Sequence, residues 1–146
     1  MICPGLQLSR PRGIEELKIP SHLYNDKNVN SSPLILKIAN FPRLKRIEIG
    51  DECFKKVREF VIGGLASLES VKIGEECFRI SYDERNDGIC RITNCPNLRQ
   101  LEIGRRSFWD FKTFELSNLN SLQSIKFGWD CFEYADFSLK GERKNE

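Results

Sequence analysis

One eleven-residue stretch decides the fold of this chain: residues 44–54 read LKRIEIGDECF. The spacing L-x-x-I-x-I-G-x-x-C-F returns three times, beginning at Leu68, Leu98 and Leu122, and a weaker copy begins upstream at Ile14. Five copies of one pattern indicate a repeat architecture, which has to be recognised before any other assignment.

A second short element, two apolar residues separated by one residue, precedes each copy. These elements begin at Leu6, Leu36, Phe60, Cys90 and Phe114, and a sixth begins at Phe137. Successive starts from the first to the fifth are 30, 24, 30 and 24 residues apart. We therefore expect one repeat domain over residues 1–146, with repeats starting near 6, 36, 60, 90 and 114 and an incomplete coil with a charged tail at 137–146.

Both elements have the period of two that is typical of half-buried β-strands, and their apolar residues are mostly β-branched or aromatic. No helix-length amphipathic stretch with capping residues is present. The glycine that follows the L-x-x-I-x-I strand in four of the five copies, as at Gly50 and Gly74, suits a corner with positive φ or close backbone approach. The predicted fold is mainly β: a solenoid of about five coils with two short parallel strands per 24–30-residue repeat and little or no regular helix.

The copies resemble leucine-rich repeats, and they are most similar to the BspA-like type found in surface and adhesion proteins of anaerobic bacteria and in protozoa. The resemblance covers the chain from Leu6 to about Leu139. It implies a leucine-rich-repeat solenoid that binds other proteins. Cys53, Cys77 and Cys131 come one residue later than the asparagine or cysteine of the common repeat, so no asparagine ladder is expected.

Composition argues against several classes of function. The 146 residues include 23 Lys and Arg, 21 Asp and Glu and one His, with a formal net charge of +2. This balance lacks the basic excess of a nucleic-acid binder, and no apolar run approaches the length of a membrane span. A single histidine leaves little room for metalloenzyme or Ser-His chemistry, and no phosphate-binding glycine loop occurs.

Catalysis, cofactors and metal binding are therefore not expected, and the chain is predicted not to be an enzyme. The rival class is the polysaccharide-cleaving β-helix enzyme, which needs acidic residues clustered across adjacent coils. Here the outward strand positions alternate in charge instead, as at Glu48, Lys72, Glu102 and Lys126. Such cross-strand pairs help to order the coils.

The six cysteines favour an intracellular setting. Five of them occupy columns that hold apolar residues in other copies, which is how buried free thiols behave. A disulfide between Cys53 and Cys77 on adjacent coils is the alternative. The absence of a signal peptide agrees with an intracellular location, whereas a fragment of a longer chain would allow a cell-surface one. The sequon at Asn30 would then be open to glycosylation.

The candidate partner-binding residues are aromatic and basic. Trp109 and Trp129 stand in columns that are polar in the other copies, and with Arg105, Arg106 and Tyr134 they would form one patch on the last two coils. The structural alternative is that each tryptophan folds over its own corner or caps the end of the solenoid.

Tyr82, in the polar loop 81–88, is a further candidate, because solenoid insertions often form binding edges.

The expected function is a non-enzymatic protein–protein interaction scaffold with a rigid repeat surface. The alternative is a segment of a cell-surface adhesin or antigen that binds host proteins or glycans. The expected partner is a protein, the remainder of a longer solenoid, or a second copy that meets an uncapped end.

Overall fold

The computed structural model describes residues 5–8, 13–23, 35–79, 87–132 and 135–140. These residues form eleven strands and no helix. In chain order the strands are β1 (Gly5–Leu8), β2 (Glu16–Ile19), β3 (Ile35–Ile38), β4 (Arg46–Ile49), β5 (Glu59–Gly63), β6 (Ser70–Ile73), β7 (Gly88–Thr93), β8 (Gln100–Ile103), β9 (Phe111–Ser117), β10 (Ser124–Phe127) and β11 (Asp136–Lys140).

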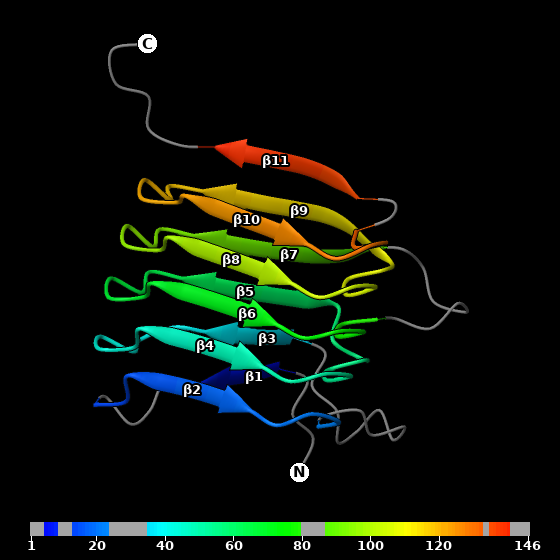
Figure 1. Cartoon of the computed structure of the whole chain (residues 1–146), viewed down its shortest axis with the longest axis horizontal. Helices are drawn as coiled ribbons and strands as arrows, with labels where there is room; N and C mark the ends of the chain where they lie inside the picture. Colours follow the sequence, from blue (N-terminus) through cyan, green and yellow to red (C-terminus); the bar gives the residue numbers. More distant parts are fainter. Residues whose placement is uncertain (1–4, 9–12, 24–34, 80–86, 133–134, 141–146) are drawn as a thin grey trace.

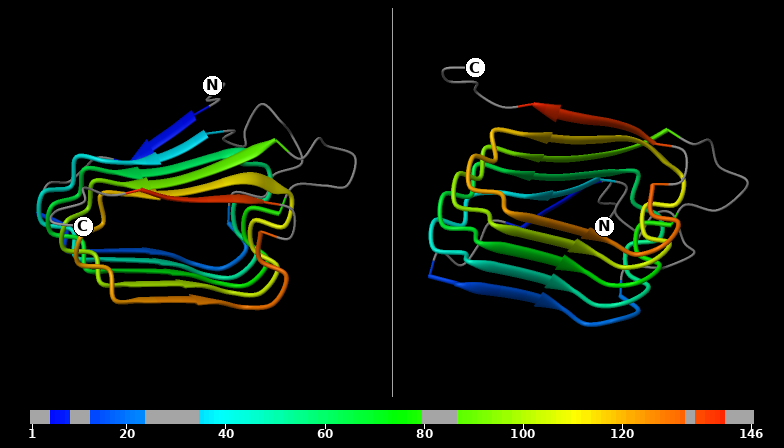
Figure 2. Two further views of the ribbon diagram at one scale, coloured as in Figure 1. Left: turned by 90° about the horizontal axis from the view of Figure 1, so that it is seen from above. Right: turned by 45° about the horizontal axis from the view of Figure 1, so that its top comes forward.

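The strands form two parallel sheets that face each other across the core (Figures 1 and 2). Sheet A has the order β1-β3-β5-β7-β9-β11, and sheet B has the order β2-β4-β6-β8-β10. Each coil therefore gives one strand to each sheet, and the next coil stacks on it in the same direction. The predicted parallel β solenoid is confirmed.

The register follows the sequence repeat. In sheet A the pairing aligns the first apolar residue of every coil, which places in one column Leu6, Leu36, Phe60, Cys90, Phe114 and Phe137. In sheet B it aligns Lys18, Glu48, Lys72, Glu102 and Lys126 in one outward column. The alternating charges expected from the sequence thus lie next to one another on the outer face.

An aromatic stack fills the corner at which the chain leaves sheet B. Phe54, Phe78, Phe108 and Phe132 stack with successive ring-centroid distances of 5.3, 4.6 and 4.7 Å. All four side chains are buried. Stacked rings contribute beyond the burial of their area, so this column ties each coil to the next.

The corner glycines are required for close approach and not for positive φ. A Cβ added to Gly74 would lie 2.7 Å from the carbonyl carbon of Gly50, and one added to Gly104 would lie 2.6 Å from that of Gly74. Positive φ occurs instead at the non-glycine residues that follow, such as Glu52 (54°) and Phe54 (57°). Of the two reasons the sequence offered for these glycines, the packing of neighbouring backbones is the correct one.

The opposite corner, after each sheet A strand, has its own left-handed residue. Asn40, Gly64, Asn94 and Asn118 have φ between 55° and 68°, and asparagine and glycine tolerate this region best. The amide of Asn118 donates to the side-chain oxygen of Asn94 at 2.7 Å. An asparagine contact between coils therefore exists. It lies at the corner after sheet A and not in the cysteine column after sheet B.

The cysteine column has a role beyond filling space. The thiols of Cys53, Cys77 and Cys131 donate to backbone oxygens of the preceding coil, at 3.1, 2.9 and 2.9 Å. Ser107 stands in the same column and donates to the oxygen of Gly74 at 2.7 Å. Serine can replace cysteine there because it is also small and also carries one donor. All five cysteines of the described residues are free thiols.

Candidate functional site

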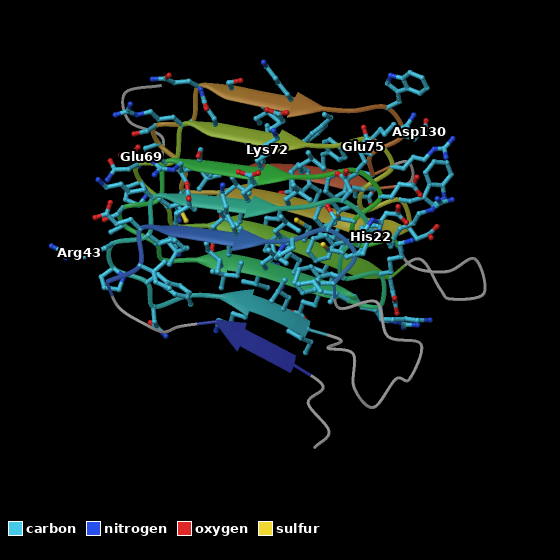
Figure 3. All side chains as sticks on the ribbon, turned by 60° about the horizontal axis from the view of Figure 1, so that its bottom comes forward. His22, Arg43, Glu69, Lys72, Glu75 and Asp130 are labelled. Atoms are coloured by element: carbon cyan, nitrogen blue, oxygen red, sulfur yellow. The ribbon has the colours of Figure 1, made fainter. Side chains whose placement is uncertain are left out.

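The surface at which sheet B strands end carries most of the candidate residues. Figure 3 shows His22, Glu75 and Asp130 along this side, Lys72 on the outer face of sheet B, and Arg43 and Glu69 at the opposite side, where these strands begin. His22 is exposed. Since the coils stack in register, side chains from consecutive repeats form columns on one rigid surface.

A hollow of about 480 Å³ lies on this surface beside Trp129. Its lining consists of Glu75, Glu102, Ile103, Gly104, Arg105, Lys126, Phe127, Gly128 and Trp129. The indole is 72 % exposed. The guanidinium of Arg105 donates to the carboxylate of Glu75 at 3.2 Å, so the ion pair holds one charged wall of the hollow in place.

Trp109 lies apart from the lining of this hollow. Its ring is half-buried, and the Arg79 guanidinium carbon stands 5.5 Å from the ring centroid, a cation–π contact. Arg79 also donates to Glu76 at 2.8 Å. The neighbouring Asp110 is buried; desolvation raises the pKa of its carboxyl, and the positive charge of Arg79 opposes the rise. Trp109 thus contacts Arg79 at the corner of the preceding coil and takes no part in the lining of the hollow.

The predicted patch is therefore divided. Arg105 and Trp129 share the hollow, while Arg106 contacts the tryptophan through its backbone, its N–H donating to the Trp129 carbonyl at 2.8 Å. Tyr82 and Tyr134 lie outside the described residues, as does the sequon at Asn30.

Sequence reasoning singled out none of the apolar side chains at the end of the solenoid as site residues. Ile125, Phe127, Phe137 and Leu139 are exposed, although the equivalent residues one coil earlier are buried. The sequence gives no sign of this exposure, because the residue types are those of the core. Only the position of these strands in the stack leaves them uncovered.

Several carboxylates of the strand-end surface have cationic partners. Lys55 donates to Glu52 at 3.0 Å, and this hydrogen bond lowers the pKa of the Glu52 carboxyl. Glu76 is paired with Arg79. A general acid requires a raised pKa, so the Glu52 carboxyl does not have the electrostatics of one. Within the described ranges, no three His, Cys, Asp or Glu side chains form a metal-ligand group, and no helix could cross a bilayer.

Comparisons with protein-family models, curated proteins and solved structures found no match for this chain. The surface of the chain itself is therefore the basis for inferring its function. Two features stand out on it: the hollow beside Trp129 and the exposed apolar side chains of β10 and β11.

Proposed function

We propose that this chain is a non-enzymatic protein-binding solenoid and that Trp129 anchors its partner. The observation that carries this proposal is the exposed indole at the rim of a charged hollow. Tryptophan and arginine are the residue types most enriched at the energetic centres of protein interfaces. The proposal includes no catalytic step and no cofactor.

The rigidity of the frame supports this function. The backbone of Trp129 is fixed because its carbonyl accepts from Arg106 and the preceding Gly128 donates to Ile103 at 2.8 Å. Arg105 is oriented by Glu75. A guanidinium that is already held by an ion pair, on a backbone that is already fixed, loses little conformational entropy when a partner binds, and that saving increases affinity.

Within this proposal the repeats are leucine-rich repeats of the BspA-like type. The recurring L-x-x-I-x-I-G-x-x-C-F spacing supports the assignment. In such a protein the apolar columns hold the coils together, and the variable outward residues determine which partner binds.

The test is affinity capture from a lysate of cells that express the chain naturally, with quantitative mass spectrometry. Wild type is compared with a Trp129→Ser, Arg105→Glu variant and with Trp109→Ser, a matched control that also removes one tryptophan. Thermal denaturation of each variant establishes that it is folded.

We expect a partner that wild type and Trp109→Ser recover equally and that the double variant loses at least about tenfold, as for an interface hot spot. Equal recovery by all three would place the interface elsewhere and contradict the role of Trp129. Recovery of no partner above an unrelated solenoid would contradict the binding function itself.

A further inference from the structure

The last coil is half covered. β11 pairs with β9 and extends sheet A by one strand beyond the coil formed by β9 and β10 (Figure 1). In sheet B, β10 is the terminal strand and pairs only with β8 among the described residues. The position opposite β11, next to β10, therefore holds no strand from the described part of the chain.

The walls of this position are apolar. Phe137 and Leu139 of β11 are 53 % and 71 % exposed, whereas their register partners Phe114 and Leu116 on β9 are each 2 % exposed. On sheet B, Ile125 and Phe127 are 39 % and 37 % exposed, although their columns are buried in β4, β6 and β8. The phenyl rings of Phe127 and Phe137 stand 6.0 Å apart and nearly perpendicular.

The edge of β10 offers backbone hydrogen bonds in addition to this apolar surface. A terminal strand presents a row of N–H and C=O groups that can pair with another chain. Extended segments bind by this route: the backbone supplies affinity, and alternate side chains supply specificity. β10 is four residues long, so the position accommodates one short strand.

The charges on the outer face of sheet B indicate which side chain a strand next to β10 should carry. The outward column of sheet B reads Lys18, Glu48, Lys72, Glu102 and Lys126, with the sign alternating at every step. Opposite charges directly across neighbouring strands are stabilising, and like charges are destabilising. An acidic residue beside Lys126 would continue the alternation.

We propose that the open edge of β10 binds an extended segment of a partner protein, parallel to β10, with the pattern apolar–acidic–apolar. The two apolar side chains would pack against Ile125, Phe127, Phe137 and Leu139, and the acidic side chain would lie beside Lys126. This inference goes beyond the proposed function, because it uses the strand edge of β10 and the exposed side chains of β11; it shares Lys126 and Phe127, but neither Trp129 nor Arg105, with the hollow.

Two other occupants fit less well. A second copy of the chain would present β2, the other terminal strand of sheet B, and its Lys18 would then face Lys126. Residues 141–146 read GERKNE and contain no apolar side chain to place in the position. Strands with the required pattern, such as β8, are already paired on both sides.

The test uses a synthetic peptide with the sequence of residues 98–104, LRQLEIG, which carries the apolar–acidic–apolar pattern of β8. Its Glu102→Lys counterpart reverses the charge. Both dye-labelled peptides are titrated by fluorescence polarisation to millimolar concentration against wild type and Lys126→Glu. Lys112→Glu, an exposed residue of β9 with the same change in net charge, is the control.

We expect wild type and Lys112→Glu to prefer the acidic peptide by about fivefold and Lys126→Glu to prefer the lysine peptide by a similar factor, the size of a cross-strand charge pair. Leu139→Asp, which lies outside the hollow, should weaken both peptides. Hydrogen exchange should slow at β10 when the acidic peptide binds. Because Trp129 and Arg105 are unchanged, failure here leaves capture through the hollow intact.

Three results would overturn the proposal. The first is no saturable binding at millimolar peptide, and the second is equal affinity for both peptides in wild type and Lys126→Glu. The third is concentration-dependent dimerisation of the chain that Lys126→Glu strengthens, because a glutamate there would pair with Lys18 of a second copy. That result would assign the edge to self-association.

Discussion

The middle coils and the last coil are built from the same columns but differ in what covers them. Phe60 in the middle belongs to the same sheet A column as Phe137; it is buried, and its ring lies 4.6 Å from that of Phe78 and 5.9 Å from that of Phe108. Phe137 in the last coil has comparable ring neighbours on one side, and its other side faces solvent. In a solenoid, the contribution of a residue to the free energy of unfolding therefore depends on whether coils lie on both sides of it.

The largest expected difference lies in the aromatic columns. Phe60→Ala should lower the free energy of unfolding by about 3–5 kcal/mol, because it leaves a cavity within the buried core. Phe137→Ala should lower it by about 1 kcal/mol, since the ring is half exposed already. Urea denaturation of both variants measures the difference. Equal losses would mean that the last coil is as well covered as the middle.

Substitutions of the corner glycines should also cost more stability in the middle coils than in the last coil, with smaller losses than those of the aromatic residues. Gly74→Ala should cost about 2–3 kcal/mol, because the new Cβ would meet the backbone of Gly50 while another coil packs on the far side. Gly128→Ala meets the Cα of Arg105 at 2.7 Å, but its coil has fewer neighbours and should relax, leaving a loss of about 1 kcal/mol.

Gly13→Ala is the control for these variants, because nothing lies within 4 Å of the added Cβ. Its unfolding midpoint in urea should stay close to that of wild type. If Gly74→Ala were equally neutral, the close approach of neighbouring coils would not be the reason for glycine in this column.

Substitutions in the cysteine column, where Cys53, Cys77, Ser107 and Cys131 donate to the preceding coil, should lower the free energy of unfolding by about 1–3 kcal/mol. Ser107→Ala removes the hydrogen bond to Gly74 and the acceptor for the Cys77 N–H, so two buried backbone groups lose their partner. Cys131→Ala should cost less, because Cys131 is only half-buried and water can replace the thiol. Ser107→Cys should preserve stability to within about 1 kcal/mol, since it retains the donor. Thermal denaturation distinguishes the three.

The smallest difference should come from the charge column. Lys72→Glu places like charges against both Glu48 and Glu102 and should cost about 1 kcal/mol. Lys126→Glu has one register partner, Glu102, and should cost about 0.5 kcal/mol. Denaturation in low and high salt is the measurement, because salt should reduce both losses. Losses that salt does not change would exclude electrostatics as their cause.

Much of the fold could be predicted from periodicity. The spacing of Leu44, Ile47 and Ile49 and its return predicted the strands, their inward faces and the register, because residues two apart share one face of a strand. The positive φ at Glu52 and Phe54 could not be predicted, since neither residue type favours that region and tertiary packing imposes it.

The candidate site was predictable only in part. Trp129 was found because it breaks a polar column, and Arg105, a polar residue of that same column, was named with it because arginine is common at interfaces; the structure brings the two together in one hollow. Trp109 broke a column in the same way, yet it packs against Arg79. The direction of a side chain at a corner depends on local backbone angles and neighbours, which a repeat pattern does not contain.

The sequence by itself determined the repeat, its two strands per coil and the chemistry of each column, because these follow from local period and residue type. Only the tertiary structure decided which members of a column are covered. Ile103 and Phe127 belong to one column, but a neighbouring coil buries the first and leaves the second exposed. Exposure depends on what is stacked next, and that property belongs to the assembled solenoid.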